Sequence, residues 1–164
     1  MTKNTKVISA YPACGKSYFK ENVQDFFESE EDITVLDSDS SQFSWIYENG
    51  EKTDKRNPDF PKNYIKHIKD NIGKVDIIFV SSHSIVRREL AKNNIKFTLV
   101  VPKKNCLNEW MIRYINRGDS NEFIDNQIDN WDKWLNEITQ EKDTYSKLIQ
   151  LEQRQYIADI IHKC

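Results

Sequence analysis

The residues from Ala10 to Ser17, which read AYPACGKS, have the types and the order that bind a phosphate group. In a phosphate-binding loop, backbone N–H groups point at the phosphate oxygens, a lysine reaches the outer phosphates of a nucleotide, and a Ser or Thr hydroxyl binds Mg²⁺. Gly15 would let the backbone approach the phosphates, Lys16 would supply the charge, and Ser17 would bind the metal. The sequence therefore predicts a nucleotide site formed by Ala10, Tyr11, Pro12, Ala13, Cys14, Gly15, Lys16, Ser17 and Tyr18.

Position 10 departs from the usual loop pattern, which has Gly where this chain has Ala10. The position needs a small side chain to turn out of the preceding strand, and Ala is the least costly replacement. The alternative is a chance Gly-Lys-Ser in an ordinary turn. The apolar run before the loop and the helical pattern after it favour the phosphate-binding interpretation.

Two carboxylates, Asp37 and Asp39, follow the second apolar run in the segment VLDSDSS. Side chains two residues apart lie on the same side of a strand, so both carboxylates can face one site. We expect Asp37 to bind the magnesium shell together with Ser17, and Asp39 to orient an acceptor group or take its proton. The alternative is an Asp/Ser turn with solvated carboxylates, which these residue types favour.

A third apolar run ends in Ser81, Ser82 and His83, just before a helical pattern. Ser82 or Ser84 is a plausible helix N-cap. We expect Ser82, His83 and Arg87 to contact the acceptor, although His83 taken alone is more typical of a loop histidine without a catalytic role. No Asp ends this run, so the acidic residue of a Walker B strand is not evident.

Two further segments could contact the ligands. For Trp45, in the segment FSWIY, we favour packing in the core, with stacking on a base or packing over the acceptor as the other interpretation. Arg113 and Arg117 are four residues apart, so they share one helix face. Because phosphoryl transfer depends on positioning and charge neutralisation, we expect these arginines and Lys16 to steady the transferring group. A solvated basic face is the alternative.

The elements that must position these residues alternate along the chain. The patterns predict strands at 6–10, 32–41, 75–83 and 95–102, and helices at 16–28, about 64–72, 84–93, 103–117 and 121–139. Residues 145–151 predict a fifth strand, although a helix from 143 to 162 fits almost as well, and residues 42–61 predict an irregular block. This order predicts an α/β fold of three layers, with a parallel sheet of about five strands and helices on both faces. In such sheets ligands bind beyond the carboxyl ends of the strands.

Composition and charge are consistent with this interpretation. The chain has 164 residues, which suggests one domain, 1–164. Residues 21–39 carry eight acids and no base, whereas residues 83–117 carry eight bases and two acids. A focused basic segment in a chain of net charge −2 fits a small polyanion better than long DNA or RNA. Three scattered cysteines match no zinc pattern, and no apolar run is long enough to span a membrane, so we expect a protein of the reducing cytoplasm.

The phosphate loop, the Asp-x-Asp pair and the basic helix together resemble the P-loop kinases of small molecules, such as nucleoside monophosphate kinases and shikimate kinases. The chain is also similar to small adenylate-kinase-like proteins of bacteriophages and bacteria, on the segments DSDSSQFSW and VSSHSIVR. The resemblance implies ATP and Mg²⁺ as cofactors and a lid-like segment at about 103–118 carrying Arg113 and Arg117. We place an acceptor-binding insertion at about 40–73.

These residues predict an ATP-dependent kinase that transfers the γ-phosphoryl group to a small acceptor, most simply a nucleoside or a (deoxy)nucleoside monophosphate. The acceptor's chemistry is left open, because Asp39 favours a hydroxyl acceptor while Arg87, Arg88 and the basic centre favour a phosphorylated one. The alternatives are a nucleotide-binding regulatory module without transfer and a 5′-hydroxyl polynucleotide kinase. The sequence does not predict the oligomeric state.

Overall fold

The protein is described here by a computed structural model that covers residues 1–28 and 32–164. Its centre is a five-stranded sheet in the order β2-β5-β1-β6-β7, and every paired neighbour is parallel. The strands are β1 (Lys6–Ala10), β2 (Val35–Asp37), β5 (Ile77–Ser81), β6 (Thr98–Pro102) and β7 (Lys147–Leu151). The predicted α/β fold class is confirmed, and so is the fifth strand, since the alternative helix at 143–162 does not form.

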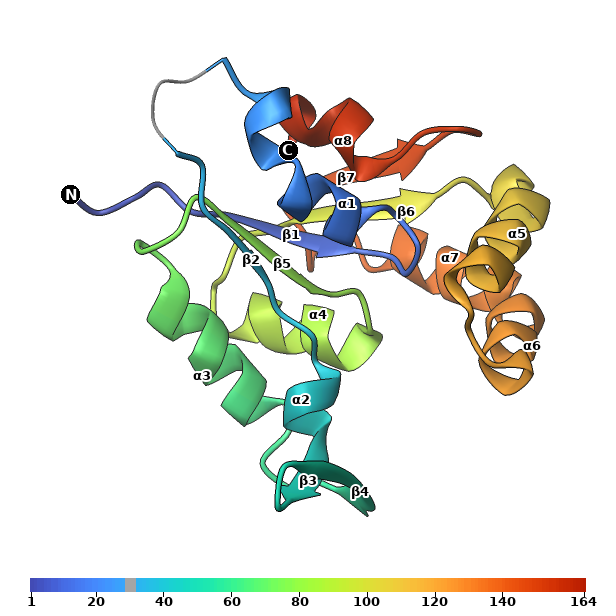
Figure 1. Ribbon diagram of the computed structural model, residues 1–164, viewed down its shortest axis with the longest axis horizontal. Coiled ribbons are helices and arrows are strands. Elements are labelled where there is room, and N and C mark those ends of the chain that lie inside the picture. Colours follow the sequence, from blue (N-terminus) through green and yellow to red (C-terminus); the bar gives the residue numbers. More distant parts are fainter. Residues whose placement is uncertain (29–31) are drawn as a thin grey trace.

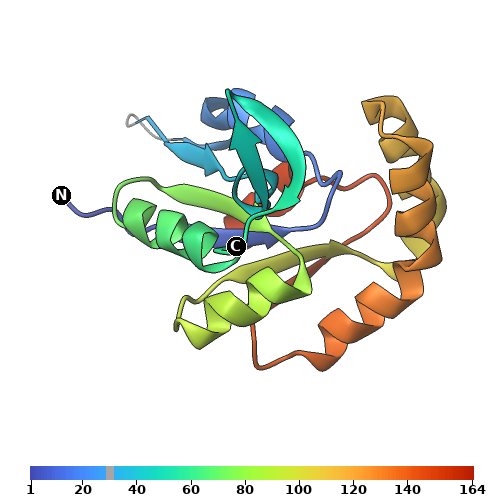
Figure 2. The same ribbon diagram turned by 90° about the horizontal axis from the view of Figure 1, so that it is seen from below.

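Helices cover both faces of this sheet (Figures 1 and 2). The elements α1 (Lys16–Glu21), η1 (Val23–Phe26), α8 (Ile157–Ile160) and η3 (Ile161–Lys163) lie on one face. The helices α3 (Lys62–Asn71) and α4 (Ser84–Lys92) lie on the other. The elements η2 (Lys104–Cys106), α5 (Leu107–Arg117), α6 (Asn121–Asp129) and α7 (Trp131–Gln140) follow β6, and α5 and α6 lie beyond the carboxyl ends of β1 and β6 (Figure 1).

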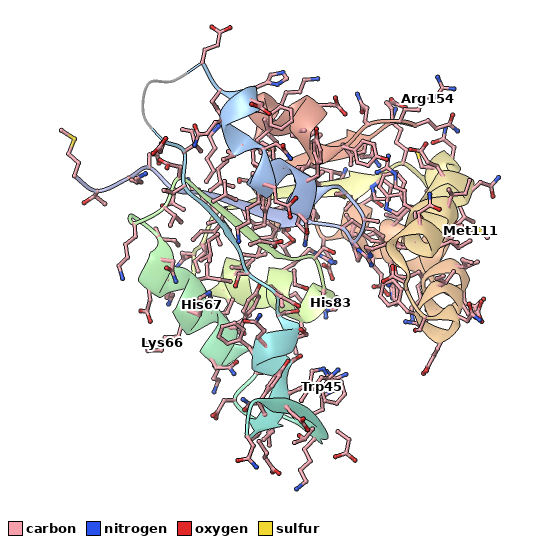
Figure 3. All side chains as sticks on the ribbon, in the orientation of Figure 1. Trp45, Lys66, His67, His83, Met111 and Arg154 are labelled. Atoms are coloured by element: carbon pink, nitrogen blue, oxygen red, sulfur yellow. The ribbon has the colours of Figure 1, made fainter. Side chains whose placement is uncertain are left out.

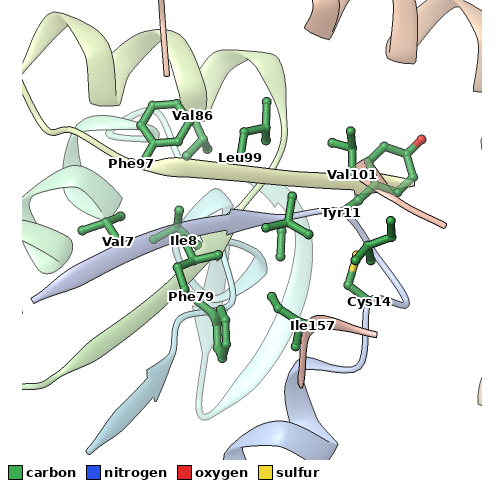
Figure 4. Close-up of a cluster of buried hydrophobic side chains, with 14 of the residues drawn as sticks. Val7, Ile8, Tyr11, Cys14, Phe79, Val86, Phe97, Leu99, Val101 and Ile157 are labelled. Carbon is green, nitrogen blue, oxygen red and sulfur yellow. The ribbon is translucent and has the colours of Figure 1, made fainter. Parts of the chain in front are cut away.

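The core lies on both sides of the central strands, because β1, β5 and β6 are apolar on both faces, as buried parallel strands are. Val86 of α4 and Leu99 lie on one side of the sheet, and Phe79 and Ile157 lie on the other (Figure 4). The Phe79 ring also packs edge-on against Phe19 of α1, with 5.7 Å between ring centroids. Each such buried side chain contributes about 1.5–3 kcal/mol to folding, so this packing fixes the strand ends that carry the candidate site.

The prediction that residues 42–61 are irregular is wrong for most of the segment. It holds α2 (Ser41–Ser44) and an antiparallel hairpin, β3 (Trp45–Glu48) and β4 (Glu51–Arg56). The hairpin turns at Asn49 and Gly50, with φ of 52° and 83°. Positive φ at both central residues defines a type I′ turn, for which Asn-Gly is the favoured pair. The sequence signal was therefore present, but the strand after it, β4, is almost entirely charged and shows no apolar alternation.

Three predicted elements are shorter or divided in the structure. The helix expected at 16–28 ends at Glu21, because Asn22 caps it with its side-chain amide donating to Tyr18 O at 2.8 Å. The helix expected at 121–139 breaks at Asn130, whose amide likewise bonds back to Asn126 O and which precedes α7. Side-chain amides compete in this way with the helical backbone. The strand expected at 32–41 contains only the short β2, and the acids Glu30 and Glu31 lie outside the described residues.

No helix in the described ranges is both long and apolar enough to cross a membrane. The predicted roles of two segments, acceptor binding at about 40–73 and a lid at about 103–118, stay predictions.

Candidate functional site

The loop between β1 and α1 takes its sharp turns at Ala13 and Gly15, which have φ of 63° and 87°. Gly15 is required for a second reason, because a Cβ atom there would lie 2.9 Å from Cδ1 of Tyr156. Ala10, in contrast, is still part of β1, pairs with Ser81 and Val100, and is not among the positive-φ residues. The missing first glycine therefore costs little, because the chain leaves the strand without a left-handed residue at this position.

Three successive carbonyl oxygens of the loop accept hydrogen bonds from groups outside it. Pro12 O accepts from the Trp110 indole at 2.9 Å, and Ala13 O accepts from the Arg113 guanidinium at 3.1 Å. Cys14 O accepts from the N–H of Ile157 at 2.8 Å. The loop is thus held by α5 on one side and by α8 on the other.

The backbone N–H groups of the same loop have no such partners. Within the described part of the chain, nothing accepts a hydrogen bond from the N–H groups of residues 13 to 17. Successive N–H groups left free by left-handed turns and by the first turn of a helix form a concave anion-binding nest. Five donors in a row are therefore available to a phosphate group.

A cavity of about 730 Å³ opens over this loop. The loop side of it is lined by Ala13, Cys14, Gly15, Lys16, Ser17 and Tyr18, and the far side by Arg113, Asn116, Arg117 and Tyr156. Lys16 is half-buried and Ser17 is exposed, so the ammonium and the hydroxyl can both reach a ligand. The cavity brings together the loop and the two arginines that the sequence predicted.

Arg113 is held by the protein and is not free to close over a ligand. Its side chain is only 7% exposed, and its Nη2 donates to Glu109 Oε1 at 2.6 Å and to Gln155 O at 2.7 Å. Its guanidinium also lies 3.9 Å from the ring centroids of both Trp110 and Tyr156. Together with the bond to Ala13 O, these contacts make Arg113 a brace for the loop.

Arg117 is the more available of the two arginines. It bonds Asp119 at 2.8 Å, yet its side chain is 44% exposed and lines the cavity. A surface ion pair of this kind is worth about 0–1 kcal/mol, so the guanidinium can exchange it for a phosphate oxygen.

The predicted acidic pair lies at the carboxyl end of β2 and does not line the cavity over the loop. Asp39 accepts hydrogen bonds at 2.8 Å from both the N–H and the hydroxyl of Ser41, the first residue of α2, as in the Asp/Ser turn alternative. Asp37 is aligned with Phe79 in the sheet, and its side chain makes no hydrogen bond with the described residues.

The Tyr64 hydroxyl holds the ends of β2 and β5 together. It donates to Ser38 O at 2.7 Å and accepts from the N–H of Ser81 at 3.1 Å. Burial, together with the nearby charges of Asp39 and Asp37, raises the pKa of Tyr64 to about 12, against the lowering effect of these hydrogen bonds. The hydroxyl therefore stays protonated and the two strand ends stay in place.

A second cavity, of about 460 Å³, opens on the other side of the same loop. The loop and α4 line it with Tyr11, Pro12, Ser82, His83, Ser84 and Arg87, and α6 and α7 line it with Phe123, Asn126, Gln127, Trp134, Glu137 and Ile138. The predicted acceptor residues Ser82, His83 and Arg87 thus lie together. Because Tyr11 and Pro12 border this cavity and Ala13 begins the other, the two cavities share one loop.

The positive charge of Arg87 is largely neutralised within the protein, so it contributes little to ligand binding in the second cavity. It is 3% exposed, its Nη2 bonds Glu141 Oε2 at 2.7 Å, and its Nη1 donates to Ser82 O. Burial alone would raise the pKa of Glu141, but hydrogen bonds from Arg88 and Arg87 outweigh it and lower that pKa. The carboxylate is therefore ionised and neutralises Arg87.

His83 lies at the start of α4, where Figure 3 labels it. Desolvation, and then the positive charges of Arg87, Arg56 and Lys16, lower the pKa of His83 from its usual value of 6.5. The imidazole is thus mainly neutral at pH 7.

Trp45 lies on the β3–β4 hairpin, away from both cavities (Figure 3). The Arg56 guanidinium lies 3.7 Å from its ring centroid and the Lys52 ammonium 4.3 Å. Trp45 is half-buried and is not part of the hydrophobic core, so the favoured prediction of core packing is wrong. Its predicted contact with an acceptor stays a prediction.

Sequence reasoning missed the residues that hold the loop and the wall of the second cavity. Trp110 and Tyr156 come to the loop from segments about 100 and 140 positions away, which no local pattern reveals. Glu109 does not contact the loop itself but holds Arg113, which does. Trp134, on the helix predicted at 121–139, is half-buried and lines the second cavity. Asn126 and Gln127 carry no motif, and only the packing of α6 against α5 brings them there.

Among the described residues no group of three or more His, Cys, Asp or Glu side chains could hold a metal ion. This is compatible with Mg²⁺ held by nucleotide phosphates, because Mg²⁺ in such sites takes few protein ligands and keeps several waters. A scan against protein-family models finds no matching family, and a search of curated proteins finds no match.

Proposed function

We propose that the protein is an ATP-dependent phosphotransferase whose donor site is the cavity over residues 13–18. The observation that carries the proposal is the loop itself, in which three carbonyl oxygens are occupied while five successive N–H groups are free. Lys16 and Arg117 add positive charge at the edge of this nest, and a cavity of about 730 Å³ has room for a nucleotide.

The residues present fit ATP with Mg²⁺. Ser17 would hold the metal, with Asp37 at the carboxyl end of β2, two strands from β1, as the candidate second contact. The bound metal would neutralise the phosphate charge. The N–H groups of residues 13–17 would bind the β-phosphate region, and Lys16 would bind the outer phosphate oxygens. Arg113 keeps the loop in its binding conformation, and Arg117 stabilises the charge that moves during transfer.

The test is acceptor-stimulated ATP turnover, with a panel of nucleosides, (deoxy)nucleotides, 5′-hydroxyl oligonucleotides and small alcohols. The wild-type protein is compared with Lys16→Ala and with Lys20→Ala, an exposed lysine on the same helix that does not line the cavity. We expect one acceptor to raise turnover in the wild type and in Lys20→Ala, and Lys16→Ala to lose it. If no acceptor raises turnover above the Lys16→Ala level, the kinase proposal is wrong.

A nucleotide-binding module without transfer is the second candidate. It is favoured by Ser81, which ends β5 opposite Ala10 where an acidic residue would assist the metal, and by Asp39, which is engaged with Ser41. This candidate predicts ATP binding that depends on Lys16 without turnover under any acceptor. A 5′-hydroxyl polynucleotide kinase, the third candidate, predicts oligonucleotide binding that weakens steeply with salt.

A further inference from the structure

The second cavity differs from the donor site in what its walls can recognise. Two aromatic side chains, Phe123 and Trp134, form part of its wall, and the amides of Asn126 and Gln127 lie beside them. Gln127 is buried, and its Oε1 accepts a hydrogen bond from the Tyr114 hydroxyl at 3.3 Å, which fixes the orientation of the amide. The Nε2 group of Gln127 makes no hydrogen bond with the described residues, so it is available to a ligand.

These walls suit a flat polar heterocycle. Aromatic side chains stack on nucleobases, and amide and carboxylate side chains bond the edges of the base. Glu137 is half-buried and makes no ion pair among the described residues, so its carboxylate can accept from an N–H group of a base. A volume of about 460 Å³ lies in the range of small-molecule sites.

The charge of this cavity does not suit a phosphate group. Arg87 is neutralised by Glu141, His83 is mainly neutral at pH 7, and Glu137 is an unpaired acid. Arg88 also binds Glu141 and is exposed. Both arginines bond the single carboxylate of Glu141, and Glu137 adds a second acid, so these four side chains sum to no net charge. A phosphate dianion would therefore bring negative charge that the described lining of the cavity does not compensate.

We propose that the second cavity binds the acceptor and that this acceptor is an unphosphorylated nucleoside, whose base lies against Phe123 and Trp134. The inference rests on the proposed kinase function for the transfer step, and it selects the hydroxyl acceptor over the monophosphate. The step breaks the bond between the γ-phosphorus and the bridging oxygen of ATP and forms a bond between that phosphorus and the nucleoside hydroxyl oxygen. ADP leaves, and the hydroxyl proton passes to solvent.

The test measures kcat/KM for each common nucleoside and for its 5′-monophosphate, at saturating ATP and magnesium. We expect the nucleoside to exceed its monophosphate by about tenfold or more, for at least one base. Trp134→Ala should raise the KM for that nucleoside by about 10–100-fold through lost stacking. The KM for ATP should stay unchanged.

Glu137→Gln tests the charge argument without removing bulk. It should improve the monophosphate relative to the nucleoside, because the repelling charge is gone. The matched control is Asp132→Asn, an exposed acid on the same helix that does not line the cavity, and it should leave the ratio unchanged.

Direct nucleoside binding separates the two proposals. Titration of the nucleoside into the protein without ATP should shift the indole resonance of Trp134 in NMR spectra. If monophosphates are preferred while ATP turnover depends on Lys16, the nucleoside inference is overturned and the kinase proposal stands. If ATP does not bind, the kinase proposal fails, and the Trp134 shift still decides whether the cavity binds a nucleoside. A lack of both nucleoside turnover and the Trp134 shift overturns the inference.

Discussion

The two cavities share one loop and differ in what the loop and its neighbours present to a ligand. On the α5 side the loop offers free N–H groups together with Lys16 and Arg117. On the α4 side Tyr11 and Pro12 border a cavity of aromatic rings and amides, and Arg87, the one arginine among its described lining residues, is already paired. The comparison shows that a basic segment in the sequence need not form a basic surface, because an arginine that is ion-paired within the fold is less available to bind a ligand.

The largest expected effect is at Lys16. Lys16→Ala removes the only lysine that lines the donor cavity in the described structure, and we expect it to lower kcat by about 10²–10³-fold, as loss of one charge-stabilising donor does. Steady-state turnover with the best acceptor measures the loss. If Lys16→Ala kept wild-type turnover, Lys16 would not stabilise the transferring group, and the assignment of the α5-side cavity as the donor site would be contradicted.

Substitution of the two arginines of α5 should affect different properties, stability for Arg113 and turnover for Arg117. Arg113→Ala should lower the free energy of unfolding by about 2–4 kcal/mol, because it leaves Glu109 and the loop carbonyl without their partner in a buried site. Arg117→Ala should change it by no more than about 1 kcal/mol, while lowering turnover. Urea unfolding and turnover of both variants are the measurements, and equal effects on stability would contradict the assignment of Arg113 as a brace.

Substitution of two glycines by Ala separates the cost of a steric clash with Tyr156 from the cost of placing a side chain at positive φ. Gly15→Ala and Gly118→Ala both place Ala at positive φ, of 87° and 82°, which costs about 1–2 kcal/mol. Only at position 15 does the new Cβ meet Tyr156, at 2.9 Å, whereas nothing lies within 4 Å at position 118. We expect Gly15→Ala to be the less stable variant in thermal unfolding. Equal stabilities of the two variants would show that the Tyr156 side chain moves to accommodate the new Cβ without a cost in stability.

The smallest expected effect is the electrostatic coupling between the cavities. Desolvation and the cations Arg87, Arg56 and Lys16 lower the pKa of His83 from 6.5, so NMR titration should place its midpoint below that value. In Lys16→Ala one of these positive charges is gone, the charged imidazole is less disfavoured, and the pKa should rise. Lys20→Ala is the control, and an unchanged His83 titration in Lys16→Ala would contradict the proximity of the two cavities.

The sequence predicted the sheet, because β1, β5 and β6 are apolar runs next to turn residues, and it predicted the loop, because the residues of a phosphate nest are consecutive. It could not predict that Arg87 is paired with Glu141, which is 54 positions away, or that Arg113 donates to Gln155 O, which is 42 positions away. The pairing of Arg113 with Glu109, in contrast, follows the i,i+4 spacing of one helix. The hairpin at 45–56 had its Asn-Gly signal, but most of its side chains are charged and exposed, so no apolar period accompanied it. Local chemistry was therefore readable, while the pairing of Arg87 and the contacts of Arg113 with the loop depended on the tertiary fold.

The most direct measurement is the change in backbone amide NMR resonances when ATP with Mg²⁺ is added to the protein. If the loop is the donor site, the largest shifts occur at the N–H groups of residues 13–17, and they are lost in Lys16→Ala and kept in Lys20→Ala. Shifts centred on residues 123–138, or no shifts in the loop at saturating ATP, would contradict the assignment of this loop as the phosphate site.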